Sequence, residues 1–112
     1  MQNDDDIASI LADKYMREIL SLLSNAELSA QQIATNLAIP TSTTYRKLKT
    51  LEDMKLIKKS KVVRTLEGLD ESYYKSLVAQ IDIQFKDGKM TYRIERLKMD
   101  EKIVRLWQKF KE

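Results

Sequence analysis

The stretch that decides the fold runs from Ser29 to Ile57 and reads SAQQIATNLAIPTSTTYRKLKTLEDMKLI. Its first part carries a clear helix start, because Ser29 is a favourable N-cap and Gln32 can complete a capping box. Ala38-Ile39-Pro40 then turns the chain. Proline is tolerated only at the beginning of a helix, so the next helix is expected to begin at Pro40 or just after it. The stretch therefore predicts two short helices joined by a tight turn.

The second of these helices, expected over about residues 41–54, carries hydroxyl residues in its first turn and basic residues in its second. Hydroxyl and guanidinium groups hydrogen-bond the edges of DNA bases, and lysine ammonium groups hold phosphates. A helix with these groups at its leading end is suited to the DNA major groove. The candidate DNA-binding residues of this helix are Thr41, Ser42, Thr43, Tyr45, Arg46, Lys47 and Lys49.

The hydroxyl residues have a second explanation, because serine and threonine also favour helix N-termini. One or two hydroxyls are enough for a cap, whereas residues 41–44 supply four and are followed by Arg46 and Lys47. The sequence therefore favours DNA binding over capping alone. Tyr45 fits stacking or a phosphate contact at DNA, and it equally fits packing beside the first helix. The sequence leaves these two roles of Tyr45 open.

A basic segment follows the second helix, and its composition changes from helical to β. Residues 58–65 are rich in β-branched Val and Thr and predict a strand, with turn residues at 67–70. We expect a β-wing here that contacts phosphates or the minor groove of DNA. Lysines at a strand edge also protect against aggregation, which is the alternative explanation. The candidate DNA-binding residues of the wing are Lys58, Lys59, Lys61 and Arg64.

The remaining elements are expected from periodicity. A first helix should run from about Asp6 to Leu23, since its apolar residues have helical spacing. Residues 72–85 alternate as one long strand, and Asp87-Gly88 is a strong signal for a type I′ hairpin turn before a returning strand. A terminal helix is expected over about residues 99–111.

The expected terminal helix carries an apolar stripe at i, i+3, i+4 and i+7 spacing. Such a stripe either covers the core of its own domain or packs against a partner subunit. Because earlier residues already supply a core, we expect a homodimer interface here. The candidate interface residues are Ile103, Leu106, Trp107 and Phe110.

Composition restricts the class of protein. A chain of 112 residues supports one domain, here residues 1–112, with a helical part over 6–57 and a β-wing and hairpin over 57–97. The chain has no Cys and no His. Disulfides, thiolate or imidazole metal sites and the commonest general base are therefore excluded. Because no acidic pair has the spacing of a carboxylate site, we expect no catalytic residues, no metal ligands and no cofactor.

Two further features concern location and charge. No apolar run approaches the ~20 residues of a membrane span, and Asp4 to Asp6 are unlike the basic start of a secretory signal, so we expect a cytoplasmic protein without a membrane partner. Net charge is +3, and residues 41–64 hold eight basic residues against two acidic ones. The positive field is thus expected over the second helix and the wing, where a polyanion can dock.

These features resemble a known family. Residues 28–59, LSAQQIATNLAIPTSTTYRKLKTLEDMKLIKK, resemble the ArsR/MarR-type winged helix-turn-helix regulators, particularly small archaeal ones, whose recognition helix typically reads STVYRxLxxLExxGLI. The resemblance implies an α+β fold with a three-helix bundle, a β-wing or hairpin and a C-terminal helix. It also implies a dimeric transcription regulator. The matching positions are Ser42, Thr43, Tyr45, Arg46, Leu48, Leu51, Glu52, Leu56 and Ile57.

The sequence departs from the family pattern at three positions. Ala38 and Lys55 stand where glycine is usual, and a left-handed backbone conformation at such a residue would cost about 1 kcal/mol. Thr44 replaces a core valine and brings a hydroxyl to an apolar position. The Cys and His motifs of metal-sensing members are absent from the sequence altogether.

Two functions are compatible with the sequence. The first is a sequence-specific transcriptional regulator that binds double-stranded DNA as a homodimer, with its recognition helix in the major groove. The second is a winged-helix protein–protein interaction module without direct DNA reading, because a fold does not fix a function. The basic, hydroxyl-rich second helix favours the first. No residue identifies the class of a small-molecule effector.

Overall fold

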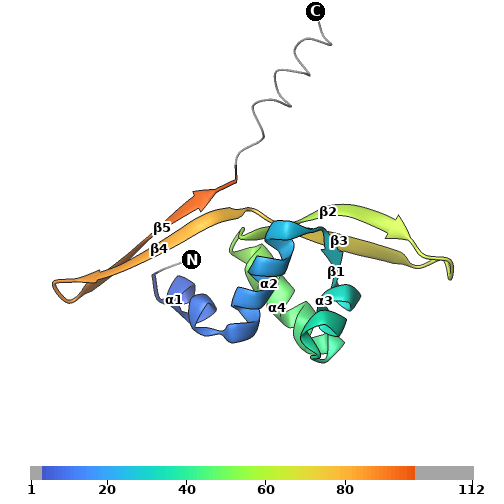
Figure 1. Ribbon diagram of the computed structural model, residues 1–112, viewed down its shortest axis with the longest axis horizontal. Helices are drawn as coiled ribbons and strands as arrows, with labels where there is room; N and C mark the ends of the chain where they lie inside the picture. Colours follow the sequence, from blue (N-terminus) through green and yellow to red (C-terminus); the bar gives the residue numbers. More distant parts are fainter. Residues whose placement is uncertain (1–3, 98–112) are drawn as a thin grey trace, which may run out of the picture.

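A computed structural model describes residues 4–97, with helices in the N-terminal half and antiparallel strands in the C-terminal half (Figure 1). Helices α3 and α4 form a helix-turn-helix, and β2 with β3 forms a wing, so the expected α+β winged helix-turn-helix is confirmed. The elements are α1 (Asp4–Ala12), α2 (Lys14–Asn25), β1 (Leu28–Ser29), α3 (Ala30–Leu37), α4 (Thr41–Asp53), β2 (Ile57–Arg64), β3 (Asp70–Ser76), β4 (Val78–Lys86) and β5 (Lys89–Arg96).

The single first helix expected from Asp6 to Leu23 is wrong, because the chain forms two helices there with Asp13 between them. Asp13 has an extended backbone (φ −85°, ψ 117°), and its carboxylate accepts the N–H of Met16 at 3.0 Å. An aspartate in this conformation caps the helix that follows and ends the one before it. Periodicity does not detect the break, since both helices direct apolar residues into the same core.

The start of α3 confirms the predicted capping box. The Ser29 N–H donates to Gln32 Oε1 at 3.0 Å, and the Gln32 N–H donates to Ser29 Oγ at 3.2 Å. The two hydrogen bonds satisfy two N–H groups that a helix end otherwise leaves without partners. This pairing fixes where α3 begins, one residue after the short strand β1.

Helices α3 and α4 end in the same way, with a residue in the left-handed conformation. Ala38 has φ 54° and Lys55 has φ 60°. After α3, the Ile39 N–H donates to the Ala34 carbonyl at 3.1 Å, and after α4 the Leu56 N–H donates to the Leu51 carbonyl at 3.0 Å. These bonds are those of a Schellman motif, in which the left-handed residue is usually glycine. Both helices therefore keep the glycine-type ending although neither position is glycine.

The strands form two separate sheets, one of three strands in the order β1-β3-β2 and one of the two strands β4 and β5. The single strand expected over residues 72–85 is wrong, because it is interrupted at Leu77. The Leu77 N–H donates to the Leu56 carbonyl and the Leu77 carbonyl accepts the Leu97 N–H, both at 2.8 Å. Since its backbone groups serve other segments, neither sheet continues through Leu77.

The β4–β5 hairpin closes at the expected turn. Asp87 has φ 53° and Gly88 has φ 74°, and a type I′ turn requires positive φ at both central residues. The hairpin and the wing extend from the helical body in opposite directions (Figure 1).

A single core joins the helices to the bases of both hairpins. Ile81, Tyr92 and Ile94 of the β4–β5 hairpin are partly buried against it. Its buried members are Ile7, Ile10, Ile19, Leu20, Leu23, Ala30, Ile33, Leu48, Leu51, Met54, Leu56, Ile57 and Tyr74. The expected terminal helix, with Ile103, Leu106, Trp107 and Phe110, lies outside the described residues.

Candidate nucleic-acid interface

Helix α4 has one buried and one exposed face. The buried face consists of Thr44, Leu48 and Leu51. Residues three and four positions apart share a face of a helix. The opposite face is therefore an exposed stripe, called the α4 stripe below, that consists of Ser42, Arg46 and Lys49.

The hydroxyl groups at the start of α4 are not used to cap it. The N-cap residue is Pro40, and within residues 4–97 no side chain makes a capping hydrogen bond at this helix end. Thr44 differs from the other three, since it is fully buried and its Oγ1 donates to the Pro40 carbonyl at 3.1 Å. Capping therefore does not explain why Thr41, Ser42 and Thr43 carry hydroxyl groups. The hydroxyl of Thr44 has its hydrogen-bond partner at the start of the same helix.

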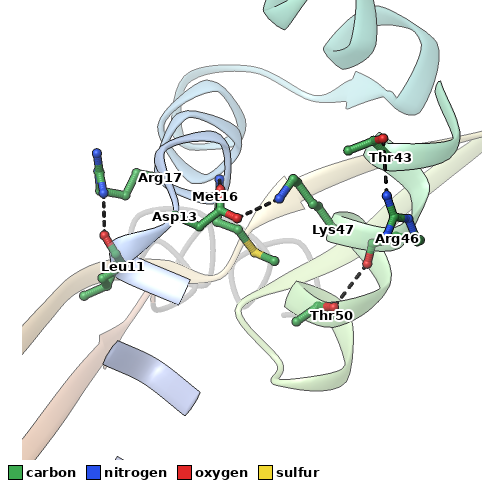
Figure 2. Close-up of polar contacts among 8 residues, drawn as sticks. All are labelled: Leu11, Asp13, Met16, Arg17, Thr43, Arg46, Lys47 and Thr50. Carbon is green, nitrogen blue, oxygen red and sulfur yellow. Dashed lines mark hydrogen bonds and ion pairs between the residues drawn. The ribbon is translucent and has the colours of Figure 1, made fainter. Parts of the chain in front are cut away.

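Arg46 and Lys47 are adjacent in the sequence and point in different directions (Figure 2). Arg46 is exposed, and its guanidinium lies 3.4 Å from the Thr43 hydroxyl on the same side of α4. Lys47 turns towards α2, where its Nζ lies 2.7 Å from Oδ2 of Asp13. The Lys47 side chain is only 18% exposed. The structure thus brings Arg46 onto the α4 stripe and gives Lys47 a partner inside the fold.

Asp13 has two roles at once. One carboxylate oxygen caps α2 and the other binds Lys47 (Figure 2). The hydrogen bond from Lys47 is the largest influence on the pKa of Asp13 and lowers it from its ordinary value of 3.8, while burial acts in the opposite direction. Asp13 is therefore ionised at neutral pH, and it ties the start of α2 to the middle of α4.

The remaining α4 candidates lie on or beside the stripe. Lys49 is highly exposed and its Nζ is 3.8 Å from the Asp53 carboxylate, an arrangement that contributes little in water. Thr41 and Thr43 are half-buried beside the stripe. Tyr45 is exposed on the other flank of α4.

Tyr74 of β3 shows which side of the wing faces the helices, since it is buried in the core. Burial raises the pKa of Tyr74 on β3, because its side chain lies among the apolar residues of the helices. Tyr74 pairs with Lys59 in the β3–β2 ladder, and directly opposed residues point to the same side of a sheet. Lys59 therefore lies on the side of the wing that faces the helices.

A β-bulge changes the direction of the lysines along β2. The register shifts between Lys59 and Lys61, so Lys61 points to the same side as Lys58, away from the helices. Lys58 lies directly opposite Lys75 of β3, and like charges in this position repel each other. Lys75 was not among the residues predicted from the sequence, and only the strand register identifies it.

Two wing candidates have partners within the fold. The Lys61 ammonium lies 3.5 Å from the Glu27 carboxylate and 4.9 Å from the centre of the Tyr73 ring. Arg64 lies 3.4 Å from the Asp70 carboxylate. Both ion pairs are exposed to solvent, so each is worth little and can be exchanged for another anion.

The tip of the wing is apolar and acidic, whereas its base carries the positive charge. Leu66 and Leu69 are exposed there, and the charged residues beside them are Glu67, Asp70 and Glu71. Arg64 balances only one of these carboxylates. The positive charge of the wing is therefore concentrated at its base, next to α4, and not at its tip.

Comparison with known proteins agrees with this geometry. Residues 13–59, somewhat less than half of the chain, match the family model described as bacterial regulatory protein, arsR family. Residues 13–59 are thus similar to the helix-turn-helix of that family. This ArsR-type segment spans α2, α3 and α4 and ends at Lys59 in β2. With the winged fold, it identifies a DNA-binding transcriptional regulator and not an enzyme.

A solved structure is similar in fold. HlyU from Vibrio cholerae N16961 superposes with a TM-score of 0.52 at 19% sequence identity, covering 68% of this chain and 80% of HlyU. No curated protein sequence matches the chain. The similarity therefore extends the winged fold beyond the ArsR-type segment.

Residues 4–97 contain neither a metal-binding cluster nor a membrane-spanning helix. In this range no cluster of three or more carboxylates is arranged to hold a metal ion. Of the helices described, none is long and apolar enough to cross a membrane. The predicted interface residues Ile103, Leu106, Trp107 and Phe110 lie beyond this range.

Proposed function

We propose that the protein is a cytoplasmic, sequence-specific regulator that binds double-stranded DNA as a homodimer, with α4 in the major groove. The observation that carries the proposal is the α4 stripe. Its hydroxyl, guanidinium and ammonium groups are exposed opposite the buried face of the helix. Groups of this kind on one helix face recognise base edges and the phosphates beside them.

Within the α4 stripe each residue has a distinct role. Arg46 lies one turn into the helix and reads base edges, since a guanidinium can form two hydrogen bonds to guanine. Ser42 donates to or accepts from the bases nearest the N-terminus of α4. Lys49 exchanges its weak pairing with Asp53 for a phosphate. Thr41, Thr43 and Tyr45 border the stripe and contact the sugar–phosphate backbone.

The base of the wing holds phosphates on either side of the groove. Lys59 is the first candidate because it lies on the side facing the helices. A phosphate beside Lys58 and Lys75 would relieve the repulsion between these two opposed ammonium groups. Lys61 and Arg64 can join them by releasing Glu27 and Asp70, whereas Lys47 is left out of the contact set because its pair with Asp13 is largely buried.

A homodimer follows from the size of the reading surface. A single short helix reads only a few base pairs, whereas two such helices about 34 Å apart read a near-palindrome. The stripe of Ile103, Leu106, Trp107 and Phe110, in the sequence that follows the described residues, supplies an apolar surface for association. Trp107→Ala should therefore yield monomers and weaken DNA binding together, as measured by sedimentation and by titration.

Selection of bound duplexes from a random pool, at physiological salt, tests the proposed function. We expect a near-palindromic site whose recognition weakens as salt rises, because lysine–phosphate contacts release counterions. A pool from which no duplex is retained or enriched at any salt concentration would contradict the proposal. That result would favour the alternative of a protein-interaction module, for which the apolar and acidic wing tip would be the first surface to test.

A further inference from the structure

The β4–β5 hairpin, called the ribbon below, separates polar and apolar side chains onto its two faces. One face carries three opposed apolar pairs, and the other carries opposed polar or charged pairs such as Asp82 with Arg93. This division is complete along the paired region between Gln80 and Lys89. The apolar pairs are Ile81 with Ile94, Ile83 with Tyr92, and Phe85 with Met90.

The apolar face is covered only near the base of the ribbon. Ile81, Tyr92 and Ile94 pack against the core, and α1 contacts β5 there. Towards the turn the ribbon extends beyond the helices (Figure 1), and Phe85 is 75% exposed. A two-stranded ribbon is marginally stable without a surface packed on it. The exposed half of this face would therefore gain stability from a partner that packs on it.

The sequence supplies a matching surface at the point where the ribbon ends. Leu97 is held at the ribbon base by its hydrogen bond to Leu77, and fifteen further residues follow it. Their sequence carries the apolar stripe of Ile103, Leu106, Trp107 and Phe110, with basic residues between. A stripe of this type is suited to an apolar face of similar length.

Length indicates which copy of the chain supplies the stripe. Phe85 pairs with Met90, seven residues from Leu97, so this pair lies about 24 Å from the ribbon base. The helix expected from the sequence over residues 100–110 would be about 15 Å long, with residues 98 and 99 taken up by the reversal onto the face. After reversing at the base, the chain's own stripe would stop short of Phe85. A partner's stripe can approach the ribbon from the turn end, where the apolar face is exposed.

We propose that the apolar face of the ribbon is the docking surface for residues 98–112 of a second copy of this chain. The inference rests on the proposed homodimer and specifies its interface.

Cysteine cross-linking tests the interface directly, because the chain has no cysteine of its own. Phe85→Cys protein is mixed with Phe110→Cys protein and treated with a flexible bismaleimide. We expect a covalent heterodimer that needs no DNA. Gln84→Cys, on the opposite face of β4, is the matched control and should not cross-link to Phe110→Cys.

Three results would overturn the inference. A chain that carries both Phe85→Cys and Phe110→Cys would give mainly a cross-linked monomer if the stripe covered its own ribbon. Phe85→Cys alone would cross-link to itself if two ribbons packed face to face. Failure of every pair to cross-link would show that the ribbon is not the docking surface.

A dimerisation measurement provides an independent check. Phe85→Asp should raise the dimer dissociation constant at least tenfold, while the neighbouring Gln84→Asp leaves it unchanged and far-UV circular dichroism shows both variants folded. Equal dissociation constants would contradict the inference. A monomeric protein that still selects a DNA sequence would overturn this interface and leave DNA binding intact. A cross-linked dimer without sequence preference would overturn the DNA-binding function instead.

Discussion

Replacing Arg46 and Lys47 one at a time with alanine should separate DNA binding from stability, although the two residues are adjacent in the sequence. Arg46 belongs to the exposed α4 stripe, whereas Lys47 is bound to Asp13. Arg46→Ala should therefore weaken binding to the preferred duplex and leave the free energy of unfolding nearly unchanged. Lys47→Ala should lower the free energy of unfolding and leave the DNA affinity of the folded protein nearly unchanged.

The expected magnitudes follow from exposure and distance. The Lys47 and Asp13 groups are 2.7 Å apart, and their side chains are 18% and 31% exposed. Fully exposed pairs contribute at most about 1 kcal/mol, and hydrogen bonds to charged groups about 1.5–3 kcal/mol. A partly exposed pair should contribute about 1–2 kcal/mol. Arg46→Ala should cost about 1–3 kcal/mol of DNA binding, roughly a 5- to 150-fold loss of affinity.

Urea unfolding followed by far-UV circular dichroism measures the first quantity, and fluorescence anisotropy with labelled duplexes at several salt concentrations measures the second. Asp13→Asn provides the control, because Lys47→Ala should cost much less in that background if the ion pair is responsible. The reasoning would be refuted if Lys47→Ala kept full stability and reduced the salt slope by about one unit, since its ammonium would then be contacting a phosphate.

The remaining predictions concern the same surfaces. Lys47 holds the pKa of Asp13 below its ordinary value of 3.8. The contribution of this ion pair to the free energy of unfolding is therefore complete above about pH 4 and is lost as pH falls through the lowered pKa. The free energies of unfolding of wild type and Lys47→Ala should accordingly converge in acid. Ala38→Gly should raise the free energy of unfolding by about 0.5–1 kcal/mol, since glycine adopts the left-handed conformation without strain; a decrease in the urea midpoint would contradict this. Lys59→Ala should reduce the salt slope by about one unit on every duplex, and a loss confined to one sequence would be inconsistent with a phosphate contact. One equivalent of Zn²⁺ or Cu²⁺ should leave DNA affinity unchanged, because the chain has no Cys or His; a many-fold change would reveal a carboxylate site.

The fold could be predicted wherever a local signal acts alone. The capping box at Ser29 and the turn at Asp87-Gly88 each depend on a few neighbouring residues, and both are confirmed. The single first helix and the single strand over residues 72–85 were predicted wrongly, because hydrogen bonds at one residue interrupt each pattern. Asp13 interrupts a helical pattern by capping within it, and Leu77 interrupts a strand pattern because Leu56 and Leu97 take its hydrogen bonds.

For the candidate site, residue type could be predicted from sequence but side-chain direction could not. Arg46 and Lys47 look equivalent in the sequence, yet the partner that distinguishes them is 34 residues away from Lys47. Lys75 was missed because its position opposite Lys58 follows only from the strand register. A register counted from the turn after Arg64 would pair Lys58 with Ser76, and only the bulge between Lys59 and Lys61 brings Lys75 opposite Lys58.

The junction at Leu77 has a consequence for the spacing of DNA half-sites. The backbone of Leu77 is hydrogen-bonded to Leu56, just after α4, and to Leu97, at the end of the ribbon. The Arg96 side chain also donates to the carbonyl of Lys55, next to Leu56. In the proposed dimer the ribbon would therefore hold α4 at a fixed offset from the two-fold axis. One inserted base pair moves a half-site by about 3.4 Å and rotates it by roughly a tenth of a turn. A protein so rigidly joined cannot follow that movement, and its operators should keep one invariant spacing.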